Sequence, residues 1–162
     1  QEVQYTKPSW WFGGAAAANL NFYRGSTQQL SANFTPPTAL HNGFGAALYL
    51  AVDIEYHRPK SLFGFMFQAG YDGRGAKFNE VITPCDCPAN LTSKLSYITI
   101  EPSLRFMPFK SNFYLYGGPR IAFVQQNSFE YQLGTNPNFP LQPASPEVKG
   151  DFSDVNNTII SM

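Results

Sequence analysis

The charged side chains that could do chemistry alternate with apolar residues inside short segments. Asp53 and Glu55 are two positions apart, Glu101 and Arg105 are four apart, and Arg120 lies in a similar alternating segment. Because successive side chains of a strand point to opposite faces, such spacings place charges on one face. Buried carboxylates and arginines must pair and be hydrogen-bonded. We therefore expect these five residues to form an internal salt-bridge network, with a narrow polar conduit gated by the same pairs as the alternative.

The same carboxylates could suggest a glycosidase or a protease, but catalysis by paired carboxylates needs two distinct environments and a cleft. The sequence locates neither. The two histidines, His41 and His57, fall in a predicted loop and a predicted turn, so we expect both at the surface. A histidine-based triad would also need an exposed nucleophile and an orienting group, and the chain has no nucleophile-elbow pattern. We predict no enzymatic activity and no cofactor.

Cys85 and Cys87 are the only cysteines, and Pro88 follows them in a long polar segment. In an oxidising compartment they could form a disulfide that staples a loop, although the ring would be very small. Free thiols and a soft-metal site are the alternatives, but zinc normally takes four ligands. We expect the disulfide and no metal site.

Composition excludes several classes of protein. The chain of 162 residues carries 11 basic and 11 acidic side chains, so its net charge of zero argues against a nucleic-acid-binding surface. Aromatic residues reach 16% and charged residues only 14%, which makes disorder a poor description. No uninterrupted apolar run reaches the ~18 residues of a membrane-spanning helix. At this length one domain is expected.

The strongest structural signal is alternation with a period of two from Phe44 to Tyr56. Its even positions are apolar or aromatic, and its odd positions are small or polar. Typical strands have 5–6 residues. The thirteen residues from Phe44 to Tyr56 would extend for about 43 Å at ~3.3 Å per residue. A tilted strand crosses a bilayer with roughly 9–11 residues, so this segment is long enough for a crossing. The segment therefore predicts a strand that can cross a membrane.

Four other segments alternate in the same way, and a sixth strand begins near Thr158 and is cut off at Met162. The four segments are 10–23, 62–72, 97–106 and 113–124. Short turns at 57–60 and 107–112 alternate with long polar segments at 24–43, 73–94 and 125–157, which we predict to be loops. Pro102 and Pro119 stand within predicted strands, where each removes a ladder hydrogen bond, so we expect bulges or bends there.

Three short strings, at 10–14 (WWFGG), 101–106 (EPSLRF) and 116–120 (YGGPR), resemble small outer-membrane β-barrels of the OmpA-like/porin superfamily, especially Bacteroidota-type members. The resemblance implies eight antiparallel strands, a place at the cell surface in the bacterial outer membrane and, in some members, a periplasmic peptidoglycan-binding domain. The alternation of short and long connections is typical of such barrels, which have tight periplasmic turns and long external loops, so we expect a periplasmic N-terminus and extracellular long loops. The chain supplies five strands and the start of a sixth. We therefore expect an N-terminal periplasmic extension at 1–8 and an outer-membrane β-barrel at 9–162 that is incomplete at its C-terminus.

The predicted fold is all-β, an antiparallel up-and-down transmembrane β-barrel with about eight strands, of which five to six are present in this chain. The predicted function is that of an integral outer-membrane protein with a structural or surface role, or of a subunit in a larger envelope complex. Its partners would be the lipid bilayer and other envelope proteins, with no nucleic acid. A passive diffusion pore (porin) and a soluble lipocalin-like ligand-binding barrel are the alternatives. The predicted lipid-facing residues are Phe44, Leu48, Leu50, Val52, Ile54, Phe63, Phe65 and Phe67.

Overall fold

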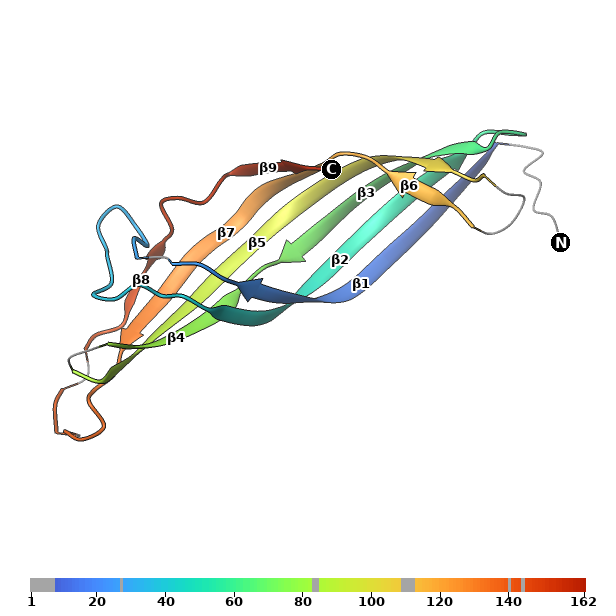
Figure 1. The fold of residues 1–162 in the computed structure, drawn as a ribbon. Coiled ribbons are helices and arrows are strands. Elements are labelled where there is room, and N and C mark those ends of the chain that lie inside the picture. Colours follow the sequence, from blue (N-terminus) through green and yellow to red (C-terminus); the bar gives the residue numbers. More distant parts are fainter. Residues whose placement is uncertain (1–7, 27, 83–84, 109–112, 140, 144) are drawn as a thin grey trace.

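The computed structural model describes residues 8–26, 28–82, 85–108, 113–139, 141–143 and 145–162, and this part of the chain is all-β (Figure 1). Its strands are β1 (Ser9–Tyr23), β2 (Gly43–His57), β3 (Phe63–Gly73), β4 (Ala76–Ile82), β5 (Cys87–Phe106), β6 (Leu115–Gly117), β7 (Arg120–Leu133), β8 (Val148–Asp151) and β9 (Thr158–Ser161). Among the described residues, none belongs to a helix long and apolar enough to cross a membrane. Except for Pro8, the predicted extension at 1–8 lies outside the described residues.

All pairings in the sheet are antiparallel, and the main path runs β1-β2-β3-β5-β7-β8. The pairings of β2, β3, β5 and β4 also close a circuit of four, because β4 pairs with both β2 and β5. Register explains this circuit: the pairs Gly73↔Ser96 of β3 and Ala76↔Ser93 of β4 are three residues apart on both strands. Strand β4 therefore continues β3 along one track between β2 and β5.

Strands β6 and β7 likewise share a track beside β5. The pairs Leu104↔Gly117 and Ile100↔Ile121 are four residues apart on both strands, and the break between β6 and β7 falls at Gly118 and Pro119. A Cβ on Gly118 would collide with the backbone carbonyl of Pro102, so only glycine fits there. The expected interruption is confirmed at Pro119. The interruption expected at Pro102 is wrong for the pairing of β5 with β3, because that ladder passes unbroken through Phe67↔Pro102.

The predicted strands are present, but two of the three predicted loops are wrong. The segment 73–94 contains β4 and the first half of β5, and the segment 125–157 contains the second half of β7 and all of β8. Their outward positions are polar, as at Asn90, Thr92 and Lys94, and this polarity resembles a loop in the sequence although the backbone is fully paired. Within the described part of 24–43, an isolated bridge joins Ser31 and Phe34, Leu40 is a further bridge residue, and the next strand, β2, begins at Gly43.

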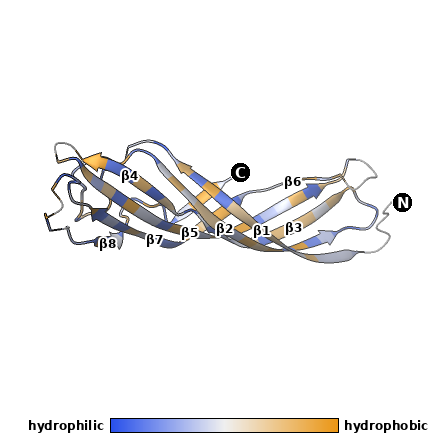
Figure 2. Cartoon of the chain, turned by 90° about the horizontal axis from the view of Figure 1, so that it is seen from below, coloured by the Kyte–Doolittle hydropathy of each residue, from blue (hydrophilic) through white to orange (hydrophobic). Residues whose placement is uncertain are grey.

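The part of the sheet farthest from the β2–β3 turn, called here the distal half, has its own apolar core. It consists of β4, β8 and the paired ends of β5 and β7. The core is formed by Leu30, Leu40, Ala76, Phe78, Ile82, Ala89, Leu91, Phe129 and Tyr131. Figure 2 shows the alternation of the strands as orange and blue bands.

The opposite face of the distal half is polar. Lys94 Nζ lies 2.6 Å from Glu130 Oε1, and this hydrogen bond lowers the pKa of the Glu130 carboxyl below its usual value. The distal half is thus arranged as in a water-soluble β-protein, with apolar side chains inside and charged side chains outside.

We expect Phe129→Ala to lower the free energy of unfolding of the chain by about 3–5 kcal/mol, since it removes a ring that is 1% exposed. Urea unfolding in detergent micelles, followed by circular dichroism, measures the change. The matched control, Gln132→Ala, alters an exposed outward residue of the same strand and should stay within about 0.5 kcal/mol. Equal losses in the two variants would show that the distal core contributes little.

Candidate functional site: an exposed apolar face over a buried charged face

The half of the sheet nearest the β2–β3 turn exposes its large apolar side chains. The eight predicted lipid-facing residues are 39–65% exposed and lie on one face of β2 and β3: Phe44, Leu48, Leu50, Val52, Ile54, Phe63, Phe65 and Phe67. Neighbouring strands add Phe12, Leu20 and Phe22 from β1, Ile98 and Leu104 from β5, Phe123 from β7 and Ile160 from β9. We call this surface the apolar belt. A contiguous apolar surface of this kind marks an interaction site in a soluble protein or a lipid contact in a membrane protein.

The belt ends abruptly along β5. Its outward residues are apolar from Ile98 to Phe106 and polar from Asn90 to Lys94. Inward residues of the same strand change in the opposite sense, from buried Leu91 to buried Thr99 and Ser103. The register between β5 and β7 shifts between Ser96 and Tyr97, so a β-bulge lies where the polarity of the two faces reverses.

One charge cluster lies on the inward face near the β2–β3 turn. Arg105 Nη1 donates to Glu55 Oε2, and His57 Nε2 lies 3.2 Å from that oxygen and 3.2 Å from Arg105 Nη1. The Arg105 guanidinium also lies over the ring of Tyr114, 3.6 Å from its centroid. These contacts surround the guanidinium with a carboxylate, an imidazole and an aromatic face.

The expected surface position of His57 is wrong, because its side chain is 2% exposed. His57 is the last residue of β2 and continues the inward row of Asp53 and Glu55, so the pleat directs it into the cluster. The other histidine, His41, is exposed as predicted, and its Nδ1 lies 3.3 Å from Glu80 Oε2.

A second cluster centres on Asp72, whose side chain is 4% exposed. Its Oδ2 accepts from Arg74 Nη2 at 2.8 Å and from Arg120 Nη2 at 2.9 Å, and its Oδ1 accepts from Asn19 Nδ2 at 2.7 Å. Asp72 ends a predicted strand and Arg74 lies in a predicted loop, so neither was among the predicted network residues. The parity of Asp72 with the inward Gln68 was the signal that could have identified it.

Aromatic rings support the second cluster. Arg74 lies over the ring of Tyr97 at 5.0 Å, and Arg120 lies 5.9 Å from the centroid of the Tyr49 ring. The Tyr49 hydroxyl accepts from Gln68 Nε2 at 2.8 Å. Tyr49 and Gln68 thus extend the second cluster along the inward face.

The five predicted network residues thus divide among different surroundings. Glu55 and Arg105 meet in the first cluster, and Arg120 joins Asp72 in the second. Neither Asp53 nor Glu101 takes part in an ion pair or a side-chain hydrogen bond within the described part of the chain. Asp53 lies against Gly13, where a Cβ would stand 2.6 Å from the carboxylate oxygen Oδ2.

Cys85 lies in the connection after β4 and forms a disulfide with Cys87, the first residue of β5. Their Cα atoms are 5.2 Å apart. Of the three states considered for these cysteines, the structure contains the bridged one. The described residues hold no group of three or more His, Cys, Asp or Glu side chains placed to bind a metal ion.

Comparisons with protein-family models, with curated proteins and with solved structures gave no match.

We expect Asp72→Asn to lower the free energy of unfolding by about 3 kcal/mol, because it leaves two arginines on a buried face without their carboxylate. Urea titration in detergent micelles measures the loss. The matched control is Asp53→Asn on the same inward face, which breaks no pair and should change stability by less than about 1 kcal/mol. An equal effect of both changes would contradict the assignment of Asp72 as the centre of a cluster.

Proposed function

We propose that the protein is an integral protein of the bacterial outer membrane whose strands cross the bilayer as part of a β-barrel, with a structural or surface role. The observation that carries this proposal is the reversed polarity of the sheet near the β2–β3 turn. There the large apolar side chains are exposed and the charges are buried. Transmembrane barrels have this arrangement, because lipid covers their outer face.

The dimensions of the belt support the proposal. On β5 the outward apolar stretch from Ile98 to Phe106 extends for about 30 Å at ~3.3 Å per residue. A strand tilted by ~45° crosses the hydrocarbon layer with roughly 9–11 residues, so this stretch is long enough for most of a crossing.

Aromatic pairs lie at both ends of the belt. The rings of Trp10 and Tyr56 are 4.8 Å apart, and those of Phe63 and Phe106 are 5.1 Å apart, at the end near the turn. At the opposite end, the rings of Phe22 and Phe44 are 5.1 Å apart. Girdles of aromatic residues at the two membrane–water interfaces are typical of such barrels.

In the proposed orientation, the β2–β3 turn and the N-terminus face the periplasm and the distal half projects outside the cell. The polar outer face of the distal half suits water, and the disulfide at its tip suits an oxidising compartment. The soluble lipocalin-like alternative fits the distal half alone, because it requires an apolar interior and a polar exterior along the whole sheet.

The free edges of the sheet indicate a partner. Within the described residues, β1 pairs only with β2, so the other edge of its 15 residues has no partner strand. In lipid each unpaired backbone group costs several kcal/mol. We therefore propose that another strand, from a further segment or from an envelope partner, pairs with β1 in the membrane.

The insertion test uses one arginine inside the belt and one beyond it. We expect Val52→Arg to weaken insertion into lipid vesicles by about 2–4 kcal/mol, because Val52 is 65% exposed within the belt. Protease protection and the gel mobility of the unheated protein measure insertion. The matched control Gln132→Arg, outward on the distal half, should insert like the unmodified chain. A chain that remains soluble and monodisperse without detergent would overturn the proposal.

A structural role also predicts that the protein does not conduct ions across a bilayer. The inward arginines are held in ion pairs, Arg105 with Glu55 and both Arg74 and Arg120 with Asp72, so we expect no discrete openings when the full chain is reconstituted in a planar bilayer. Protein denatured before addition serves as the blank. Uniform openings that appear only with the folded chain would favour the diffusion pore instead.

A further inference from the structure

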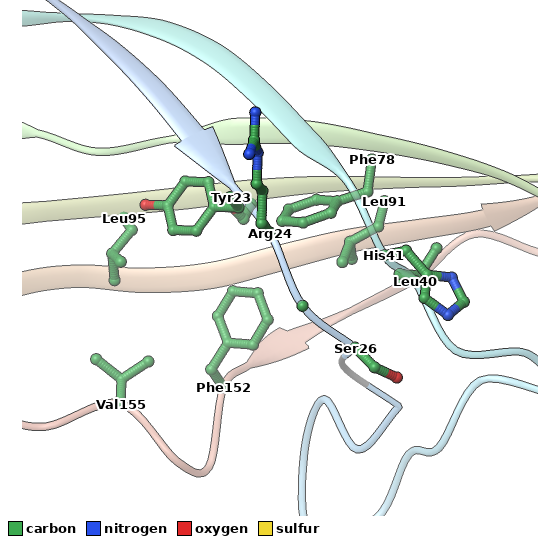
Figure 3. Close-up of a pocket in the computed structure, with 12 residues that line it drawn as sticks. Tyr23, Arg24, Ser26, Leu40, His41, Phe78, Leu91, Leu95, Phe152 and Val155 are labelled. Carbon is green, nitrogen blue, oxygen red and sulfur yellow. The ribbon is translucent and has the colours of Figure 1, made fainter.

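An apolar cavity of about 300 Å³ lies in the distal half, on the inward side of the sheet (Figure 3). It is lined by Tyr23, Arg24, Gly25, Ser26, Leu40, His41, Phe78, Leu91, Ser93, Leu95, Phe152 and Val155. Its volume is at the lower end of the ~300–1,000 Å³ typical of small-molecule sites. Neither charge cluster of the inward face contributes a lining residue.

The polar atoms of the wall are largely engaged within the protein. Ser93 Oγ accepts from the backbone N–H of Ala76 at 3.1 Å, and the Tyr23 hydroxyl donates to the backbone carbonyl of Arg74 at 2.5 Å. His41 contacts the Glu80 carboxylate at 3.3 Å. A polar molecule would thus find few partners in the cavity, whereas an apolar chain would contact Leu40, Phe78, Leu91 and the other carbon surfaces.

Arg24 is a lining residue with a positive charge, and its guanidinium extends away from Phe152 and Val155 (Figure 3), so it lies at the rim of the cavity. It follows the end of β1, its side chain is exposed, and within the described part of the chain it takes part in no ion pair or hydrogen bond. None of the described residues that line the cavity carries a carboxylate. The site therefore combines an apolar volume with one uncommitted positive charge.

We propose that this cavity binds an amphipathic anion, with an alkyl chain in the apolar volume and a carboxylate at Arg24. The chain must be of medium length, because the volume is small. This proposal does not rest on the proposed membrane function, since every lining residue lies at the end of β1, in the distal half or in the segments that pack against it.

The test is a titration of the full chain, folded in detergent micelles, with [1-¹³C]decanoate observed by NMR, and with protein-free micelles subtracted. We expect saturable binding of one decanoate per chain. Val155→Trp places an indole in the cavity from a residue outside the strands and should weaken binding at least tenfold, as should Leu91→Trp. Asn90→Trp, on the outward face beside Leu91, should bind like the unmodified chain.

Decanol, which has the same chain length but no carboxylate, tests the headgroup separately. Its binding is measured by the displacement of labelled decanoate. We expect Arg24→Gln to weaken decanoate binding about tenfold and to leave decanol binding unchanged. Binding that does not saturate above the micelle blank, or that Val155→Trp leaves unchanged, would overturn the cavity as the site. Equal losses of decanoate and decanol in Arg24→Gln would overturn the role of the charge. Because the experiment needs no bilayer, its failure is separate from a failure of insertion.

Discussion

Backbone pairing holds the pleat of this sheet, and the pleat decides which side chains are buried. On β5 the odd-numbered residues face inward from Cys87 to Arg105, through the distal half and the apolar belt alike. The change from an apolar interior to a charged one therefore comes from residue type, since the direction of the side chains stays the same. Backbone geometry intervenes at the β-bulge beside Ser96 and Tyr97, where β7 accommodates one extra residue as the polarity reverses.

Alternation was sufficient to predict the strands of the apolar belt, because every second residue from Phe44 to Tyr56 is apolar or aromatic and all of them except Ala46 are large. The same rule missed the distal strands. In β4 and the first half of β5, small inward residues such as Ala76 and Ala89 oppose polar outward ones, so the contrast between faces is weak. What forms these strands is pairing with β2, β5 and β7, and pairing between distant segments is not visible in local composition.

Which charged residues face inward was easier to predict than which of them pair with one another. Parity places Glu55, Arg105 and Arg120 inward, but register across several strands decides that Arg120 reaches Asp72 and that Glu101 has no partner within the described residues. His57 is a similar case at the end of a strand. It was predicted to lie in a turn, but β2 includes it as its last residue, so its side chain lies in the interior. The clusters therefore depend on long-range register, which a single sequence does not state.

Arg74 joins the two halves of the inward face. Its guanidinium binds the Asp72 carboxylate and lies over the Tyr97 ring, while its backbone carbonyl accepts from the Tyr23 hydroxyl at the edge of the apolar cavity. The residue thus keeps its charge on the side of the second cluster and offers the cavity only an oxygen that is already hydrogen-bonded. Because a buried charge without a partner would be costly, the pairing of Arg74 with Asp72 lets a charged interior and an apolar cavity occupy neighbouring levels of one sheet.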